Sequence, residues 1–373
     1  MLGTAGVKHV AIDARLIRSS GIGRFLRQVL AGLLTDDRFR LTLLGDPEAL
    51  APYASNGRHS IVSCKAPIYS VREQIVMPPR IPRCDLLYVP HYVVPLLYRG
   101  PLVVAVNDLI HLERSEFAPS LFAQWWARTM IRTAVSRAQR VVTLSEYSRD
   151  RLVQMIGAHP ERIEVVYPSV DRRFFRAQAP SRLAMIRDQY RLPGPYLLFV
   201  GNAKPHKNLS TLIRAVEIAR QGGLDHLLVI VGQFSGIRSN INALVHLASE
   251  LGIGERVRFL GQIPDEDLVA VYAAAELFLF PSLAEGFGLT PLEAMACGTP
   301  VLAARTTAVP EACGEAAEYY SAPENPEVLA QSILALARDP HRRTQLAALG
   351  RGRARMFSGE TSTRQMLELL YRA

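Results

Sequence analysis

Cysteine is scarce in this sequence and long apolar runs are missing, and each absence narrows the class of protein. The four cysteines are scattered through 373 residues and form neither a CxxC pair nor a metal-ligand spacing, which favours a reducing cytosol over a disulfide framework. No apolar run reaches the roughly 18 residues of a membrane-spanning helix. The first residues also lack the charged segment and apolar core of a signal peptide. We therefore expect a cytoplasmic protein.

Positive charge is in excess, but only in the first half of the chain. The formal net charge is +9; residues 1–180 hold 24 Lys and Arg against 15 Asp and Glu, whereas residues 181–373 hold 19 of each. A basic half favours contact with nucleic acid, an acidic membrane surface or a phosphorylated ligand, although solubility alone is a plainer explanation. The length suits two domains of about 150–200 residues each.

Short apolar segments alternate with helical ones, as in parallel sheets buried on both faces. In the first half, strands are expected over Val7–Ile12, Leu41–Leu44, Asp85–Val89, Leu102–Val106, Val141–Leu144 and Val165–Val166. The helix after the first strand is expected over Gly23–Leu34. We therefore expect a first doubly wound α/β domain.

The pattern restarts after a polar, arginine-rich stretch, and the domain boundary is expected near residues 172–194. Strands are then expected over Tyr196–Val200, Leu227–Val231, Val257–Leu260, Leu277–Phe280, Pro300–Ala303 and Ala317–Tyr320. Helices are expected over Leu209–Gln221, Ser239–Leu251, Asp265–Ala275 and Pro291–Cys297. Two doubly wound units in series leave a cleft between their carboxyl edges.

Two loops at strand ends have residues that suit a phosphate. In the segment Ser19–Arg24, Gly21 and Gly23 let the backbone approach a phosphate at the start of a helix, although a plain turn explains them equally well. In the segment GNAKPHKN, Lys207 lies just before a helix and Asn208 is a plausible N-cap. Lys207 is either a phosphate ligand or a solvated surface lysine.

A third loop lies between two glutamates, Glu285 and Glu293, in the segment PSLAEGFGLTPLEAMACGTPV. Strand, glycine loop and helix in this order bring free backbone N–H groups and a positive helix end together, which suits an anion. Because carboxylates would repel that anion, we expect them to bind sugar hydroxyls attached to it. The plainer interpretation of Glu293, third in a helix beginning at Pro291, is complementarity to the helix dipole.

These segments together resemble the retaining glycosyltransferases of family 4. The resemblance rests on VGNAKPHKNLSTLIRA, PSLAEGFGLTPLEAMACGTPVLA, TTAVPEACGEAA, SEYSRDRL and VVYPSVD. It implies an α/β protein with the GT-B fold, in which two Rossmann-like, doubly wound parallel-sheet domains face a central cleft. Residues 1–175 would bind the acceptor and residues 176–357 the nucleotide sugar. A C-terminal helix over about 358–373 would pack back on the first domain.

The resemblance also implies roles for single residues. Lys207 would neutralise the donor diphosphate, Glu285 would face the donor sugar and Glu293 would accept hydrogen bonds from the ribose. The other residues implied in donor binding are Gly21, Gly23, Arg24, Asn202, His206, Gly261, Gln262, Ile263, Gly286, Phe287, Gly288, Leu289 and Thr290. Attack would occur on the front face, with the leaving phosphate oxygen taking the proton of the acceptor. No metal or other cofactor is expected, since no DxD-like acidic motif stands in a suitable loop.

The sequence departs from the family pattern at two positions. Asn107, followed by Asp108, stands where the family usually has the histidine of a His-Asp-Leu motif. An asparagine can still donate and accept hydrogen bonds, so we expect Asn107 and Asp108 to act near the reaction centre. His111 could substitute, or could be a packed or surface histidine. Asn202 stands where many members have arginine, which leaves Lys204, His206 and Arg24 as possible supplements.

A helical segment over residues 117–140 suggests the acceptor side. Leu121, Trp125, Arg128 and Arg132 recur at steps of four, three and four, with Trp126 beside them. This spacing puts apolar and basic residues on one helix face, as in a membrane-surface segment; burial of the aromatics in the core is the alternative. The resemblance then implies transfer of a hexosyl group, mannosyl favoured, from GDP-mannose in preference to UDP-sugars.

The expected acceptor is a polyprenyl-diphosphate-linked or other glycan in envelope polysaccharide synthesis. The enzyme would then act at the inner face of the cytoplasmic membrane as a peripheral protein. Two other classes fit parts of the sequence. A nucleic-acid-binding α/β protein would explain the basic half but leaves Glu285 and Glu293 unexplained. A non-catalytic nucleotide-sugar sensor would explain Asn107.

Overall fold

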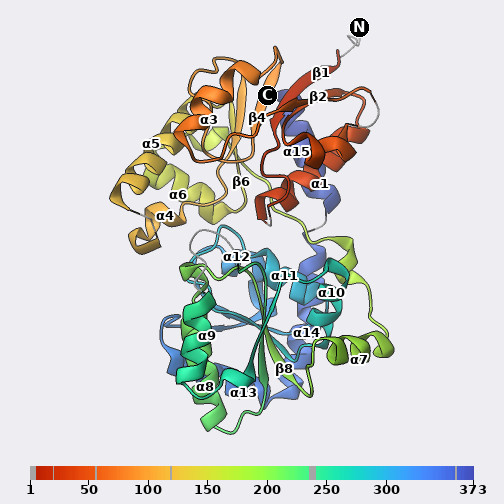
Figure 1. The fold of residues 1–373 in the computed structure, drawn as a ribbon, viewed down its shortest axis with the longest axis vertical. Helices are drawn as coiled ribbons and strands as arrows, with labels where there is room; N and C mark the ends of the chain where they lie inside the picture. The colour runs from red at the N-terminus through yellow and green to blue at the C-terminus, as the bar shows by residue number, and fades with distance from the viewer. Residues whose placement is uncertain (1–5, 20, 55–56, 118–119, 235–240, 358) are drawn as a thin grey trace. The chain divides into compact units, whose positions relative to one another are not determined.

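The chain folds into two compact units. The computed structural model describes residues 6–19, 21–54, 57–117, 120–234, 241–357 and 359–373. The first unit is Met1–Ser169 with Gly359–Ala373, and the second is Val170–Ser358 (Figure 1). The division falls six residues before the expected boundary of 175/176. The reason is that Phe174 is buried and its ring meets Tyr272 of the second unit edge-on at 5.8 Å.

The first unit contains a seven-stranded parallel sheet in the order β3-β2-β1-β4-β5-β6-β7. Its strands are β1 (Lys8–Asp13), β2 (Phe39–Gly45), β3 (Ser60–Ser63), β4 (Leu86–Val89), β5 (Leu102–Ala105), β6 (Arg140–Thr143) and β7 (Ile163–Val165). The residues of β4 and β5 are fully buried. Strand β3 was not expected, because it is a half-exposed edge strand with serine at both ends.

Helices cover this sheet and include the last helix of the described chain. They are α1 (Gly21–Thr35), α2 (Pro47–Leu50), α3 (Val71–Val76), α4 (Ile110–Glu113), α5 (Leu121–Arg137), α6 (Glu146–Ile156) and α15 (Gly359–Arg372). Helices α1 and α15 lie side by side (Figure 1). They approach closely because Gly32 has no side chain: a Cβ there would lie 2.3 Å from the Thr363 side chain. Met366 and Leu370 complete the core beneath them.

The second unit contains a six-stranded parallel sheet in the order β10-β9-β8-β11-β12-β13. Its strands are β8 (Tyr196–Val200), β9 (Leu227–Val231), β10 (Val257–Gly261), β11 (Leu277–Phe280), β12 (Val301–Ala304) and β13 (Ala317–Tyr320). Its helices are α7 (Pro180–Gln189), α8 (Leu209–Gln221), α9 (Ile241–Glu250), α10 (Asp265–Ala274), α11 (Leu289–Ala296), α12 (Val309–Cys313), α13 (Pro326–Ala337) and α14 (Pro340–Arg355). Residues 239–240 of the helix expected over Ser239–Leu251 lie outside the described residues. The two parallel sheets confirm the predicted fold class.

The start of one helix near the glutamates was predicted wrongly. Helix α11 begins at Leu289, two residues before Pro291, because Gly288 takes the N-cap position with a left-handed φ of 115°. Glu293 is therefore the fifth residue of the helix. Because the effect of a helix dipole falls off within the first turn, simple dipole complementarity no longer accounts for this glutamate.

Each sheet reverses its strand order once, between β1 and β4 in the first unit and between β8 and β11 in the second. Loops on either side of such a reversal diverge to opposite faces of the sheet and leave a crevice at the carboxyl edge, where open α/β sheets bind ligands. The expected loops after β8 and β11 therefore lie on either side of one reversal point.

Glycines hold the carboxyl edge of the second sheet together. Gly201 N donates to Val231 O at 2.9 Å, and Gly232 N donates to Gly261 O at 3.0 Å. A Cβ on Gly232 would lie 1.8 Å from the carbonyl oxygen of Gly201, so a side chain cannot fit there. The ends of β8, β9 and β10 are thus fixed at close range.

Within the described residues, no helix has the length and apolar character to cross a membrane.

Candidate functional site

An ion pair of the second unit lies at its strand-order reversal. Lys207 ends the 3-10 turn Pro205–Lys207 after β8, and Glu285 lies in the loop after β11. Lys207 Nζ donates to Glu285 Oε1 at 2.6 Å, and the two side chains are 13% and 12% exposed. The structure thus brings together the lysine and the glutamate that the sequence identified in separate loops.

Backbone contacts hold these two loops in register. Leu283 N donates to His206 O at 2.8 Å. Asn208 occupies the N-cap position of α8 with a left-handed φ of 57°, but its side chain makes no capping hydrogen bond. It donates instead to Pro281 O at 3.2 Å and Pro323 O at 2.7 Å. Asn208, which was predicted as an N-cap, therefore links the loops through buried side-chain hydrogen bonds instead.

A third loop, after β12, also supports Glu285. Thr307 Oγ1 accepts a hydrogen bond from Glu285 N at 2.9 Å, and Thr306 Oγ1 donates to Ser282 O at 2.7 Å. Thr307 has a φ of 42°, a conformation uncommon for residues other than glycine. Sequence reasoning assigned no role to these threonines. The available signal was a Thr-Thr pair at the end of a buried strand.

The surroundings of Glu285 favour its ionised form. Burial raises the pKa of the carboxyl, but the charges of Lys207 and His206 outweigh burial, so the pKa lies below its ordinary value. Lys207 Nζ also lies 5.6 Å from the centre of the Phe280 ring. The pair therefore presents an oriented cation beside a carboxylate at the crevice.

Glu293 and Phe287 lie deeper. Glu293 is 1% exposed, and its Oε2 accepts a hydrogen bond from Tyr272 Oη at 3.2 Å. Phe287 is buried and meets Phe357 edge-on at 5.2 Å. Phe287 thus anchors the glycine loop through its side chain. The burial of Glu293 means that its ribose role stays a prediction.

The remaining expected donor residues of this unit are more accessible. Half-buried residues are Gly286, Leu289 and Thr290 around the glycine loop, Asn202 and His206 after β8, and Gly261 and Ile263 at the end of β10. Gln262 is exposed. Among the described residues, Asn202 Oδ1 accepts only a 3.3 Å contact from Lys204 N. The amide of Asn202 thus has capacity for a further partner.

In the glycine loop of the first unit, close packing explains the glycine at position 23. Gly23 N donates to Ser19 Oγ at 2.9 Å, and a Cβ on Gly23 would lie 2.5 Å from Leu16 O. Helix α1 begins at Gly21, two residues earlier than expected, and open space surrounds the missing side chain of Gly21. Ser20 lies outside the described residues. Gly23 is therefore required by packing, whereas Gly21 and Arg24 remain candidates for donor contact.

A buried cluster of charges lies at the strand-order reversal of the first unit. Arg15 binds Asp13 through two hydrogen bonds, from Nε at 2.8 Å and from Nη2 at 2.6 Å. Arg15 Nη2 also donates to Glu73 Oε2 at 2.9 Å, and His91 Nε2 lies 2.9 Å from Asp13 Oδ2. The four side chains are at most 4% exposed. Sequence reasoning assigned no role to these four side chains.

The hydrogen bonds define the proton on His91. Its Nδ1 accepts from Val93 N at 3.3 Å, so Nε2 carries the proton and donates to Asp13. Burial raises the pKa of the Asp13 carboxyl, but hydrogen bonds from Arg15 and His91 outweigh burial and hold the pKa well below its usual range. For Glu73, burial prevails over the attraction of Arg15 and raises the pKa. Asp13 is thus the fixed anion of the cluster.

Asn107 and Asp108 follow β5 at the same carboxyl edge. The Asn107 Oδ1 atom is buried without a hydrogen-bond partner among the described residues, and Asp108 Oδ1 accepts from Ile110 N at 3.2 Å. Burial, followed by the charges of Asp108 and Glu73, raises the pKa of Tyr92 to about 12. Asp108 therefore lies near Tyr92, beside the buried cluster. The roles of Asn107 and Asp108 stay predictions.

Helix α5 exposes the face that the spacing predicted. Leu121 is 82% exposed, Phe122 70% and Trp125 59%, and the rings of Phe122 and Trp125 lie 5.9 Å apart. Arg128 and Arg132 are exposed one and two turns further on, whereas Trp126 is half-buried. Trp125 therefore does not belong to the core.

Within the described residues, no group of three or more histidines, cysteines and acidic residues is arranged to hold a metal ion.

Two family models match the chain, one in each half. The model described as Glycosyltransferase Family 4 matches residues 20–174, and the model described as Glycosyl transferases group 1 matches residues 186–353. The chain belongs to this glycosyltransferase family, and the predicted membership is confirmed.

Among its relatives is a D-inositol 3-phosphate glycosyltransferase of Frankia alni, 35% identical over 62% of this chain and 58% of that protein. The chain thus matches less than two thirds of that relative. An O-antigen chain mannosyltransferase B of Escherichia coli is 28% identical over 73% of both chains. The Anabaena protein HepE, solved with UDP and glucose, has a TM-score of 0.76 at 22% identity, over 98% of this chain and 99% of that one. This likeness shows the GT-B fold.

Replacing Asp13 is expected to destabilise the protein. The variant Asp13→Asn leaves Arg15 and its partners buried with one anion fewer, which should lower the free energy of unfolding by about 3–5 kcal/mol at neutral pH. Because the folded-state pKa of Asp13 is depressed, its contribution is present above about pH 3.9, the ordinary aspartate value, and is lost as the pH falls below it. Urea unfolding of the wild type and the variant at several pH values measures this difference.

The exposed Asp37, paired only with Arg58 at the surface, provides the matched control. Asp37→Asn should change the free energy of unfolding by less than about 1 kcal/mol. Equal effects of the two variants, or a pH-independent difference for Asp13→Asn, would contradict the buried-anion interpretation.

Proposed function

We propose that the protein is a retaining, metal-independent hexosyltransferase that uses a nucleotide-diphosphate sugar. The observation that carries this proposal is the Lys207–Glu285 pair at the strand-order reversal of the second unit. A cation there can neutralise a diphosphate, while the carboxylate can accept hydrogen bonds from the hydroxyls of the donor sugar. Membership of family 4 supports both assignments.

The pair also suggests how the site is held ready before the donor binds. Glu285 keeps the ammonium of Lys207 oriented, and the diphosphate takes over that ammonium when it arrives. Breaking the glycosidic bond leaves negative charge on the leaving diphosphate, which a preoriented cation and backbone N–H groups stabilise. The N–H groups come from the loop Gly286–Leu289. The leaving oxygen then takes the acceptor proton, so no protein nucleophile is required.

The donor and acceptor are proposed from the relatives. The E. coli relative is named a mannosyltransferase of the O-antigen chain, which supports GDP-mannose and a growing envelope glycan. The Frankia relative is named for inositol 3-phosphate, and HepE was solved with UDP and glucose, so UDP-sugars and a phosphorylated acceptor are the alternatives. Near the reaction centre we propose Asn107 and Asp108, with Tyr92 beside Asp108.

A donor panel tests the proposal. GDP-mannose, UDP-glucose, UDP-GlcNAc and dTDP-sugars are each added in a thermal unfolding experiment. One of them at 100 times its Kd should stabilise the folded protein by about 2.7 kcal/mol and raise the midpoint by several degrees. Binding must be followed by release of the nucleoside diphosphate when acceptor is added. Binding without turnover with any envelope glycan would favour the sensor, and salt-dependent DNA binding alone would favour the nucleic-acid protein.

Removing either member of the ion pair is expected to weaken transfer. Lys207→Ala and Glu285→Ala should each lower kcat/KM by at least about tenfold, equivalent to roughly 1.4 kcal/mol of transition-state stabilisation. The exposed Arg214 of α8 has no side-chain hydrogen bond or ion pair within the described residues, so Arg214→Ala is the control that removes the same charge as Lys207→Ala. Steady-state kinetics measure all three. Full activity of both site variants would refute the site assignment.

We also propose that α5 rests on an anionic membrane surface. Leu121, Phe122 and Trp125 form an exposed apolar end, and Arg128 and Arg132 follow on the same face. Apolar side chains enter the interface while arginines meet lipid phosphates. This location suits a lipid-linked acceptor at the inner face of the cytoplasmic membrane.

Substitutions on α5 should reduce binding to vesicles. The triple variant L121S/F122S/W125S should lower partitioning onto phosphatidylglycerol vesicles at least about tenfold, since burying each such side chain contributes roughly 1.5–3 kcal/mol. R128A/R132A should lower it by a similar factor, at about 1 kcal/mol per arginine, and only on anionic vesicles. Co-sedimentation measures both. The control V245S/L349S/M356S removes apolar side chains exposed elsewhere; an equal loss in that variant would contradict a specific role of α5.

A further inference from the structure

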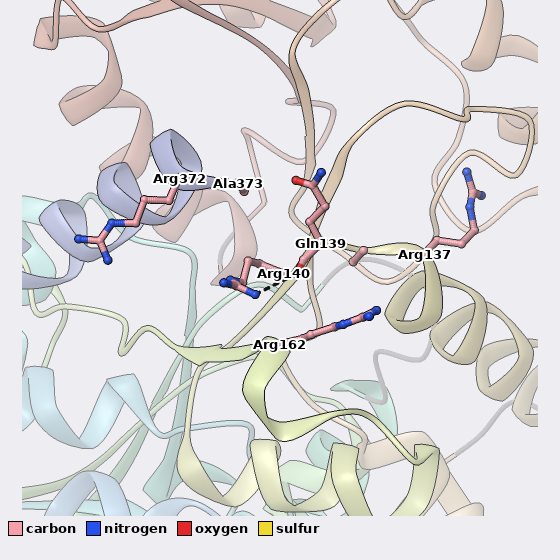
Figure 2. Close-up of a pocket in the computed structure, with 7 residues that line it drawn as sticks. Arg137, Gln139, Arg140, Arg162, Arg372 and Ala373 are labelled. Carbon is pink, nitrogen blue, oxygen red and sulfur yellow. Dashed lines mark hydrogen bonds between the residues drawn. The ribbon is translucent and has the colours of Figure 1, made fainter. Parts of the chain in front are cut away.

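An arginine-lined cavity lies at the amino edge of the first sheet, where its parallel strands begin. Asp13 and His91 lie at the opposite, carboxyl edge of the same sheet. Its volume is about 470 Å³. It is lined by Arg137, Ala138, Gln139, Arg140, Arg162, Arg372 and Ala373 (Figure 2). Four of these seven residues are arginines and none is acidic. None of them belongs to the site proposed for the donor or the acceptor.

The fold itself brings these arginines together. Strands β6 and β7 pair in parallel with Val141 opposite Ile163, so Arg140 and Arg162, which directly precede that pair, emerge side by side. Helix α5 ends at Arg137 and helix α15 ends at Arg372. Segments from three parts of the chain thus deliver guanidinium groups to the amino edge of one sheet, where the parallel strands begin.

Two of the arginines are partly explained by structure. Arg137 donates to the carbonyl oxygens of Pro95 and Tyr98, so it holds the loop after β4. Arg137 and Arg372 also lie in the last turns of their helices, where a cation complements the helix dipole. These roles account for the position of both residues. They leave the guanidinium of Arg372 without a hydrogen-bond acceptor among the residues that the structure describes.

The charges of the other lining arginines are poorly compensated. Arg140 lies 4.0 Å from Glu164, and both side chains are about half-exposed, which makes the attraction weak. Arg162 and Arg372 have no side-chain hydrogen bond or ion pair to any described residue. Arg99 adds a further positive charge near Arg137. Repulsion among these cations is relieved when an anion enters the cavity.

We propose that this cavity binds a phosphoryl anion through Arg140, Arg162 and Arg372. Guanidinium groups match phosphate oxygens in bidentate geometry, and several of them around one cavity favour a group with more than one negative charge. The volume lies within the range of about 300–1,000 Å³ typical of small-molecule sites, so an organic group attached to the phosphate also fits. The ligand is either a soluble phosphorylated compound or the headgroup of an anionic lipid.

Arginine modification by phenylglyoxal, read out by peptide mass spectrometry, tests the site residue by residue. Saturating pyrophosphate should slow modification of Arg162 and Arg372 at least about fivefold, because a charge-assisted contact shields each guanidinium. Sodium chloride at the same ionic strength should not. The control residue is Arg364, exposed on α15 and without a hydrogen bond or ion pair among the described residues. Protection of Arg364 to the same degree, or protection by sodium chloride, would overturn the proposal.

A second experiment uses Arg140 as the reporter. In R162A/R372A, pyrophosphate should no longer protect Arg140, whereas in the charge-matched control R214A/R364A it should. Phosphatidylglycerol and phosphatidylcholine vesicles replace pyrophosphate in a parallel arm, performed on L121S/F122S/W125S so that α5 contributes little. Protection by pyrophosphate identifies a soluble ligand, and protection by phosphatidylglycerol alone identifies a lipid headgroup. No protection by either would overturn the proposal.

Discussion

The reversal of strand order at the centre of each parallel sheet is the constraint on which the chemistry of both units depends. Parallel strands end at one edge, and a reversal is the point where neighbouring loops separate. In the first unit the residues at this point are Asp13 and His91, and in the second unit they are Lys207 and Glu285. Both sheets therefore put opposite or hydrogen-bonded charges at their topological centre.

The two charge clusters differ in burial, and this difference separates their roles. Asp13 and Arg15 are almost fully buried, and Arg15 is shared between two carboxylates. Buried charges of this kind are strongly tied to their partners. Lys207 and Glu285 retain 13% and 12% exposure, and the proposed exchange of one partner for a ligand requires such access. The first cluster is bound to itself, whereas the second is the site that we propose for the donor.

Sequence reasoning located the buried strands and the loops after β8 and β11, because apolar runs and strand-end glycines are local signals. It found Lys207 and Glu285 separately, since each stands at the end of such a run. It missed the partners of His91, because Asp13 and His91 are 78 residues apart and Arg15 and Glu73 are 58 apart. The α11 start was misplaced because proline was weighted above Gly288, whose left-handed backbone sets the boundary. The hydrogen bonds of the Asn208 side chain to Pro281 and Pro323 could not be predicted, because no local sequence pattern contains such tertiary contacts.

The position of α15 in the first unit has a consequence for synthesis of the chain. Lys8 Nζ donates to Tyr371 O at 3.0 Å, and Arg38 pairs with Glu368 at 2.8 Å. The first strands therefore make contacts with residues that are translated more than 300 positions later. The whole second unit, Val170–Ser358, is translated in between. At about 5–20 residues per second this takes roughly 10–40 s. During that time the apolar face of α1 that α15 later covers is open to solvent and to chaperones. The unit Val170–Ser358 can therefore complete its core before the first unit does.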